Sequence, residues 1–119
     1  MAPSVLDRLV GAIAAQDEAR VAACFADDAT FRALIPPGVR ERQGASETAA
    51  LIASWFADST QFELIGAETS EIGDRARISY RFSGIEDGAS YVVEQHLCCT
   101  VVDDRIERAD LLCSGFRPA

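Results

Sequence analysis

The sequence predicts an α+β fold in which helices pack on one face of a curved antiparallel sheet. In the first half of the 119 residues, apolar side chains recur at helical spacing. In the second half they alternate with polar ones, and short turns rich in Gly and Asp separate the alternating runs. Helices followed by a run of strands are typical of α+β proteins. The length suits one domain over residues 1–119 with a single core.

The first two helices have clear start signals. Ser4 and Asp7 match the S-x-x-D capping box and predict the start of the first helix. Residues 16–17 end it, and Asp17 is expected to cap a second helix that reaches Phe25. The apolar face of the first helix consists of Val5, Leu6, Leu9, Val10 and Ile13.

A strand and a third helix are expected next. Residues 29–35 are apolar enough for a strand, which Pro36, Pro37 and Gly38 end. Residues 38–44 are predicted to be a polar loop, and Ser46 is expected to cap the third helix. The apolar stripe of this helix is Leu51, Ile52, Trp55 and Phe56.

The second half predicts a series of antiparallel strands joined by turns. The pattern is clearest over residues 75–82, where polar and apolar residues alternate without exception. Turns are expected at residues 73–74, 83–89 and 103–104. The four predicted strands cover residues 61–72, 75–82, 90–102 and 105–116.

The strand at residues 90–102 has apolar side chains on both faces. An antiparallel sheet with one face in water should show polar residues on that face. The helices can cover only one face, so the other is expected to meet a second subunit in a homodimer. One face holds Val92, Glu94, His96, Cys98, Thr100 and Val102, and the other holds Tyr91, Val93, Gln95, Leu97, Cys99 and Val101.

The charged residues exclude several functional classes. The formal net charge is -8, and an acidic surface is a poor match for nucleic acid or an anionic membrane. All 11 basic residues are arginine, so Schiff-base chemistry on a lysine is impossible. His96 is the only histidine and no CxxC motif is present, which argues against a zinc site.

The four cysteines, Cys24, Cys98, Cys99 and Cys113, are expected to be reduced in a cytoplasmic protein. The N-terminal segment is read as an amphipathic helix rather than a signal peptide, and no run of residues is apolar enough to span a bilayer. Cys24 is expected to be a small buried side chain. Cys98 and Cys113 are alternatively candidate nucleophiles, if His96 lies close enough to activate a thiol.

Residues 24–31, which read Cys-Phe-Ala-Asp-Asp-Ala-Thr-Phe, resemble the Y/F-A-D-D-A-T signature of the nuclear transport factor 2-like (cystatin-like) superfamily. The order of helices and strands, Gly44 before the third helix, and Asp104-Arg105-Ile106 before the last strand extend the resemblance over nearly the whole chain. The chain looks most like the SnoaL-like polyketide cyclases and the ketosteroid isomerases. The resemblance implies a cone, in which a curved sheet wraps around helices and an apolar pocket, and dimerisation through the convex sheet face.

The resemblance does not bring the catalytic residues of ketosteroid isomerase with it. The positions that match its general base and its two oxyanion donors hold Ala33, Leu9 and Cys98. The Asp-Arg-Asp set of the related epoxide hydrolases is not found. Scytalone dehydratase uses two histidines, whereas this chain has one.

The same alignment places Cys98 toward the pocket, and with it Glu94 and His96. A two-residue turn at residues 103–104 then sets Glu94 opposite Cys113, His96 opposite Leu111 and Cys98 opposite Ala109. A one-residue bulge would reverse part of this register. The expected pocket wall is Phe31, Ala33, Ile52, Trp55, Phe56, Ile78, Tyr80, Phe82, Cys98, Leu111 and Cys113.

Three residues are candidates for chemistry in this pocket. His96 could act as general acid or base near neutral pH, and Glu94, two residues away on the same face, could fix its tautomer. Tyr80 could donate a hydrogen bond to a developing enolate. The alternative interpretation is a hydrogen-bonded structural histidine with Glu94 in water at the rim. Asp110 and the arginines at positions 75, 77 and 81 are expected to make surface ion pairs, the latter with Glu63, Glu68 and Glu71.

Two functions therefore remain open. The first is an isomerase, cyclase or dehydratase that moves protons on a small hydrophobic carbonyl compound, without a metal or organic cofactor. The second is a non-catalytic module of the same fold that binds a small apolar ligand or dimerises. The sequence does not decide whether the pocket is open or filled by Trp55 and Phe56.

Overall fold

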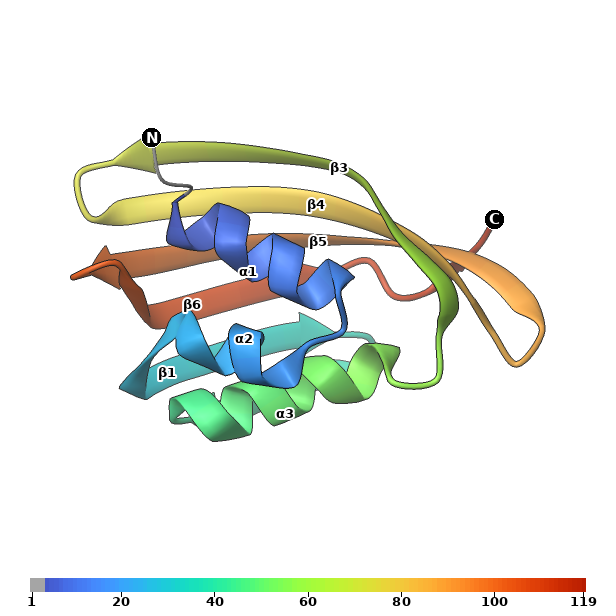
Figure 1. Ribbon diagram of the computed structural model, residues 1–119, viewed down its shortest axis with the longest axis horizontal. Helices are drawn as coiled ribbons and strands as arrows, with labels where there is room; N and C mark the ends of the chain where they lie inside the picture. The colour runs from blue at the N-terminus through green and yellow to red at the C-terminus, as the bar shows by residue number, and fades with distance from the viewer. Residues whose placement is uncertain (1–3) are drawn as a thin grey trace.

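The computed structural model describes residues 4–119 and consists of three helices from the N-terminal half of the chain packed against a long curved sheet (Figure 1). The predicted α+β class is confirmed. The helices are α1 (Val5–Ala14), α2 (Glu18–Ala23) and α3 (Ala45–Phe56). The strands are β1 (Phe25–Ile35), β2 (Gly38–Gln43), β3 (Thr60–Ile72), β4 (Arg75–Glu86), β5 (Ala89–Val102), β6 (Arg105–Cys113) and β7 (Arg117–Pro118).

The sheet has the strand order β2-β1-β6-β5-β4-β3, so β2 and β3 form its two edges and the sheet does not close. The short strand β7 pairs with β5 beyond the end of β6. Neighbouring strands run antiparallel except β1 and β6, which are parallel. From β1 the chain passes through β2 and α3 and then through the hairpins β3–β4, β4–β5 and β5–β6, so that β6 returns beside β1.

Two of the three helix starts are confirmed by their caps. The side chain of Ser4 accepts a hydrogen bond from the backbone N–H of Asp7 at 3.2 Å, and that of Asp17 accepts one from Arg20 at 3.2 Å. The prediction for α3 is wrong, because Gly44 rather than Ser46 precedes the first turn. Gly44 has a φ of 94°, a conformation that glycine adopts without steric cost.

Four predicted boundaries are also wrong. β4 continues to Glu86 and β5 begins at Ala89, so the turn expected at residues 83–89 takes up only residues 87–88. The second helix ends at Ala23, and the segment from Phe25 onward already belongs to β1. Residues 38–43 form β2 rather than a loop, because they fold back on β1 and pair with it from Ile35–Gly38 to Thr30–Gln43. The last long strand ends at Cys113, and the chain then turns into β7.

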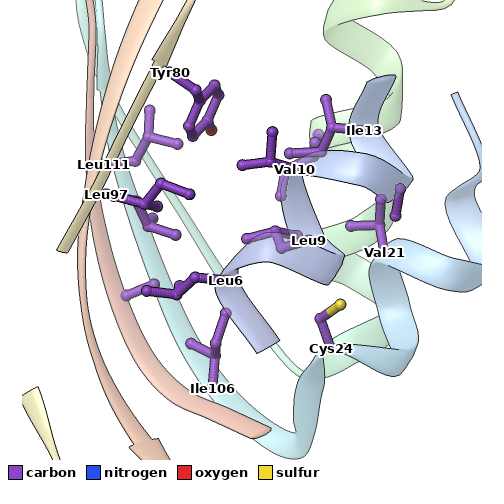
Figure 2. Packing of buried hydrophobic residues seen from close by; sticks show 14 of the residues in the cluster. Leu6, Leu9, Val10, Ile13, Val21, Cys24, Tyr80, Leu97, Ile106 and Leu111 are labelled. Carbon is purple, nitrogen blue, oxygen red and sulfur yellow. The ribbon is translucent and has the colours of Figure 1, made fainter. Parts of the chain in front are cut away.

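The helices cover the concave face of the sheet and build one apolar core with it. Figure 2 shows Leu9 and Val10 of α1 on the side that faces Tyr80, Leu97 and Leu111 of the sheet. All five side chains are at most 3% exposed. Full burial of one such side chain stabilises a fold by about 1.5–3 kcal/mol, so this layer is a main source of the stability of the fold.

Candidate functional site

The inner and outer faces of β5 are the reverse of those expected. Gln95 lies opposite Cys113, Leu97 opposite Leu111 and Cys99 opposite Ala109. The register shifts by one residue between Thr100 and Val101. Hence the prediction that Glu94, His96 and Cys98 face the interior is wrong, and these side chains lie on the outer, convex face.

The cause of the shift is one extra residue in β6. Ile106 pairs with Val101 and Arg108 pairs with Thr100, so Glu107 has no partner on β5. Glu107 and Arg108 are both exposed, although side chains of a regular strand point to alternate faces. This is the signature of a β-bulge.

On the outer face, His96 and Glu94 do form the predicted pair. The Nε2 atom of His96 lies 2.7 Å from Oε2 of Glu94, and Arg81 of β4 bonds Oε1 of the same carboxylate at 2.5 and 3.1 Å. The hydrogen bonds from His96 and then Arg81 hold the pKa of Glu94 below its usual value. Arg81 therefore forms its ion pair with Glu94 of β5. The prediction that Arg81 pairs with a glutamate of β3 is wrong.

The His96 pair lies in a shallow groove of about 580 Å³ on the outer face. The groove runs over β3, β4 and β5. The side chains of His96, Glu94 and Arg81 are 44%, 37% and 55% exposed, so water reaches all three. The lining residues are Ile65, Gly66, Ala67, Glu68, Ser79, Tyr80, Arg81, Glu94 and His96.

Inside the core, Tyr80 and Gln95 form a buried polar pair that the sequence reasoning missed. The Tyr80 hydroxyl donates to Oε1 of Gln95 at 2.7 Å, and Nε2 of Gln95 donates to the Cys113 sulfur at 3.4 Å. Tyr80 is 2% exposed and Gln95 is 1% exposed. Burial, with a smaller contribution from Cys113, raises the pKa of Tyr80 far above its usual value, so the phenol remains a hydrogen-bond donor at all physiological pH values.

Most of the predicted pocket wall does line the interior. Phe31, Ala33, Ile52, Phe56, Ile78, Phe82 and Leu111 are each at most 3% exposed. Trp55 and Cys113 are half-buried beside them. Cys98 is the exception, because the shifted register puts it on the exposed outer face.

The end of the core near the C-terminus is filled by aromatic rings. The Phe56 ring lies 4.7 Å from Phe62, 5.7 Å from Phe82 and 5.9 Å from Phe116, measured between centroids. Phe116 also meets Tyr91 at 4.8 Å, and it is 39% exposed. Phe116 is thus the partly exposed outer ring of this aromatic cluster.

The cysteines are free thiols in three environments. Cys24 is buried, as expected, and burial raises its pKa. Cys99 is also buried, which raises its pKa to about 11. Cys98 is exposed and Cys113 is half-buried under the hydrogen bonds from Gln95 and from the backbone N–H of Gly115.

Two kinds of feature are absent from residues 4–119. No group of three or more His, Cys, Asp or Glu side chains in this part of the chain is arranged to hold a metal ion. None of its helices is long and apolar enough to cross a membrane.

This arrangement of helices and curved sheet defines a class that solved structures share. A protein with a ketosteroid isomerase-like fold from Catenulispora acidiphila, in complex with trimethylamine, is 16% identical, with a TM-score of 0.77 over 93% of this chain and 85% of that one. A protein assigned as a polyketide cyclase from Xanthomonas campestris is 18% identical, with a TM-score of 0.74 over 91% and 86%. A protein assigned as an isomerase from Rhodopseudomonas palustris is 16% identical, with a TM-score of 0.68 over 97% and 93%. At these identities the likeness shows the fold alone.

Residues 6–109 match the SnoaL-like domain family. The chain therefore belongs to this family of the nuclear transport factor 2-like superfamily, as its sequence signature indicated. No curated protein matches the chain.

Proposed function

We propose that this chain is a homodimeric, non-catalytic SnoaL-like domain that binds one small, largely apolar molecule in its core. A carbonyl or similar acceptor on the ligand replaces Oε1 of Gln95 as the acceptor of the single Tyr80 hydroxyl proton. The complex of the Catenulispora acidiphila protein with trimethylamine supports small-molecule binding by this fold.

The observation that carries this proposal is the chemistry of the buried polar groups. The buried polar side chains of residues 4–119 are Thr48, Ser59 and Gln95, together with the hydroxyls of Tyr80 and Tyr91. None of these groups exchanges a proton readily near neutral pH. A ligand held there meets hydrogen-bonding groups but no general base, and this favours binding over proton transfer.

Access to the core is proposed to run past Phe116. This ring is the most exposed member of the aromatic cluster, and it stands on a short C-terminal segment that follows Gly115, whose φ is 79°. Beneath it, Phe56 contacts Phe82 and Phe82 contacts Tyr80 at 5.4 Å. Displacement of the partly exposed Phe116 ring is therefore proposed to open the route.

The proposed dimer interface is the outer face over β2, β1 and β6. Leu34 pairs with Val39 on one side and with Leu112 on the other, and the three side chains are 48%, 57% and 57% exposed. They border a shallow apolar hollow of about 300 Å³. A contiguous apolar surface of this kind usually marks an interface, and a second copy of the chain presents the matching patch.

Binding is tested with acetophenone and with ethylbenzene, which has a similar size but lacks the carbonyl. Acetophenone is expected to bind, and Phe116→Ala is expected to bind it several-fold more tightly because the outer ring is gone. Tyr80→Phe is expected to weaken acetophenone about 5- to 10-fold and to leave ethylbenzene unchanged. An affinity for acetophenone that is the same in wild type, Phe116→Ala and Tyr80→Phe would contradict the proposal.

The dimer is tested by sedimentation at micromolar concentration. Leu112→Glu is expected to give a monomer, because it places a charge in the apolar patch. Ile72→Glu is the matched control, since Ile72 is 83% exposed at the tip of the β3–β4 hairpin. A wild-type monomer, or equal effects of the two changes, would contradict the interface.

A second candidate function rests on His96 and Glu94. Their 2.7 Å contact is the geometry of a histidine oriented by a carboxylate, and the outer groove gives it access to solvent and to small molecules. We propose that any proton transfer by this protein takes place there, with His96 as acid or base and without Tyr80. Full activity of His96→Ala on an identified substrate would contradict this role.

A further inference from the structure

The strand β3 forms a free edge of the sheet, at the upper border of Figure 1. It is the last strand in the order β2-β1-β6-β5-β4-β3 and pairs only with β4. Within residues 4–119, no backbone hydrogen bond outside this strand pair involves residues 60–72. The N–H and C=O groups of β3 that point away from β4 are therefore open to another strand.

This free edge is regular from Gly66 to Ile72. The pairing with β4 has two irregularities, both before Gly66, and then advances one residue at a time to the end of the strand. Every residue of the stretch is exposed. At the usual rise per residue the stretch is about 20 Å long, which is enough to pair with a short strand of a partner.

From Gly66 onward, β3 lacks the features that usually protect an edge. Edge strands of soluble proteins are commonly short, or they carry basic side chains or proline. The strand at the other edge, β2, has six residues and includes Arg40 and Arg42. By contrast, β3 has 13 residues with no lysine, arginine or proline, and it leaves Ile65 54% and Ile72 83% exposed. These properties favour a surface that binds a strand.

All charged side chains of β3 are acidic. Glu63, Glu68 and Glu71 are exposed, and no ion pair within residues 4–119 includes any of them. The cross-strand ion pairs expected with Arg75 and Arg77 of β4 are therefore not formed. A strand added beyond β3 lies about 10 Å from β4, twice the spacing of neighbouring strands, so its side chains meet the glutamates first.

This charge argues against a second copy of the chain as the occupant of the edge. Two copies of β3 side by side would place three glutamates from each copy along one seam, with no basic side chain of either strand between them. Like charges on neighbouring strands are destabilising. Each chain also has a formal net charge of -8. A cationic strand, in contrast, has the charge that complements this edge.

We propose that β3 binds an extended, cationic peptide segment of another protein, which adds to the sheet as a further strand. Backbone hydrogen bonds along Gly66–Ile72 give affinity, as in other cases of strand addition. Glu68 and Glu71 are three residues apart and so point to opposite faces of the sheet. The preferred segment therefore has two basic residues three positions apart, one beside each glutamate. The proposal is independent of a ligand in the core and of any reaction at His96.

The test uses the capped peptide Thr-Val-Arg-Thr-Val-Arg-Val-Thr, in which the arginines are three positions apart. Backbone amide NMR shifts of the full chain report both the affinity and the place of binding. The peptide is expected to shift amides of β3 with a Kd below about 1 mM, and the same peptide with glutamate in place of arginine is expected not to bind. No binding of the arginine peptide, shifts confined to other strands, or equal binding of the two peptides overturns the proposal.

Two further measurements separate strand pairing from its alternatives. The arginine peptide with methyl groups on its central backbone nitrogens keeps its charge but loses the donors that a strand pair needs, so it is expected not to bind. Equal binding of the methylated peptide would mean that charge alone holds it, and would overturn strand addition. Broadening of the β3 amides as the concentration of the protein alone rises would assign the edge to a second copy, and also overturns the proposal.

The variants test the role of the two glutamates. Glu68→Gln with Glu71→Gln is expected to weaken the arginine peptide about 5-fold, because each exposed charge pair makes a modest contribution. The control is Glu18→Gln with Glu107→Gln, which changes the net charge equally at exposed positions of α2 and β6 and should leave binding intact. A control pair that weakens the peptide as much as the β3 pair overturns the proposed site.

Discussion

His96 and Tyr80 lie on neighbouring strands but on opposite faces of the sheet. Tyr80 pairs across the strands with Gln95, and His96 pairs with Ser79, so the phenol enters the core while the imidazole meets water. A sheet separates the two groups, and no side-chain rotation can bring them together on one ligand. The three predicted catalytic residues therefore cannot act as one group in this fold.

The first prediction concerns the pH dependence of stability through Glu94. Its pKa is lowered in the folded state, so the ionised carboxylate favours folding above the unfolded pKa, and this contribution is lost as the pH falls through the lower folded value. Between about pH 5 and pH 3, wild type should therefore lose more stability than Glu94→Gln. Urea unfolding of both proteins over this range measures the difference.

Because Glu94 is exposed to solvent, the effect is expected to be small. Glu63→Gln is a suitable control, since Glu63 is exposed on β3 and its carboxylate has no ion pair among those described. Parallel stability curves for wild type and Glu94→Gln would refute the prediction.

The helices and the long strands could be predicted because their signals are local. The apolar spacing of α1, the caps at Ser4 and Asp17, and the alternation in β4 each depend on a few neighbouring residues. The segment Gly38–Gln43 shows the limit of such local signals, because this polar segment becomes a strand only by pairing with β1. Its sequence alone favours a loop.

The site could not be predicted to the same degree, because one bulge decides it. Glu107 of β6 is the extra residue that has no partner on β5. The pairing of β6 with its other neighbour, β1, also shifts register, between Phe25 and Thr30. Such long-range pairing leaves no clear mark in the sequence. Gln95 was nevertheless a usable signal, as the single strongly polar member of an otherwise apolar set of alternate residues.

The second prediction concerns the pair of Tyr80 and Gln95. Tyr80→Phe leaves Oε1 of Gln95 buried without its donor, and Gln95→Leu leaves the Tyr80 hydroxyl without its acceptor. Each change should lower the free energy of unfolding by about 1–3 kcal/mol. The double variant replaces both partners with apolar groups and should cost less than the sum of the two. Chemical denaturation of the four proteins gives the coupling, and strictly additive losses would contradict a direct hydrogen bond.

The third prediction concerns the contact between Gly84 and Tyr91. A Cβ at Gly84 would lie 2.7 Å from the Tyr91 hydroxyl oxygen and 2.9 Å from Cζ, closer than real Cβ contacts come. Tyr91 would have to move, and its 2.6 Å hydrogen bond to Ser59 would break. Gly84→Ala should therefore destabilise the protein by about 1–3 kcal/mol.

Gly66→Ala is the matched control for this change. Gly66 also lies in a strand, its φ is not positive, and no atom lies within 4 Å of an added Cβ. This control should cost little or nothing in thermal unfolding. Equal losses at the two positions would show that the glycine at position 84 is not required by Tyr91.

The last prediction uses the two adjacent cysteines to report the faces of β5. Cys98 is exposed on the outer face, whereas Cys99 is 4% exposed and burial raises its pKa to about 11. At pH 8 a thiol with this pKa is only about 0.1% thiolate, the form that reacts with iodoacetamide. Because Cys98 lines the same hollow as Leu112 in the proposed dimer interface, the reaction is followed in the Leu112→Glu variant. Peptide mass spectrometry should show alkylation of Cys98 at least about 10-fold faster than that of Cys99. Faster alkylation of Cys99 would mean that the bulge at Glu107 is absent, and that His96 faces the core after all.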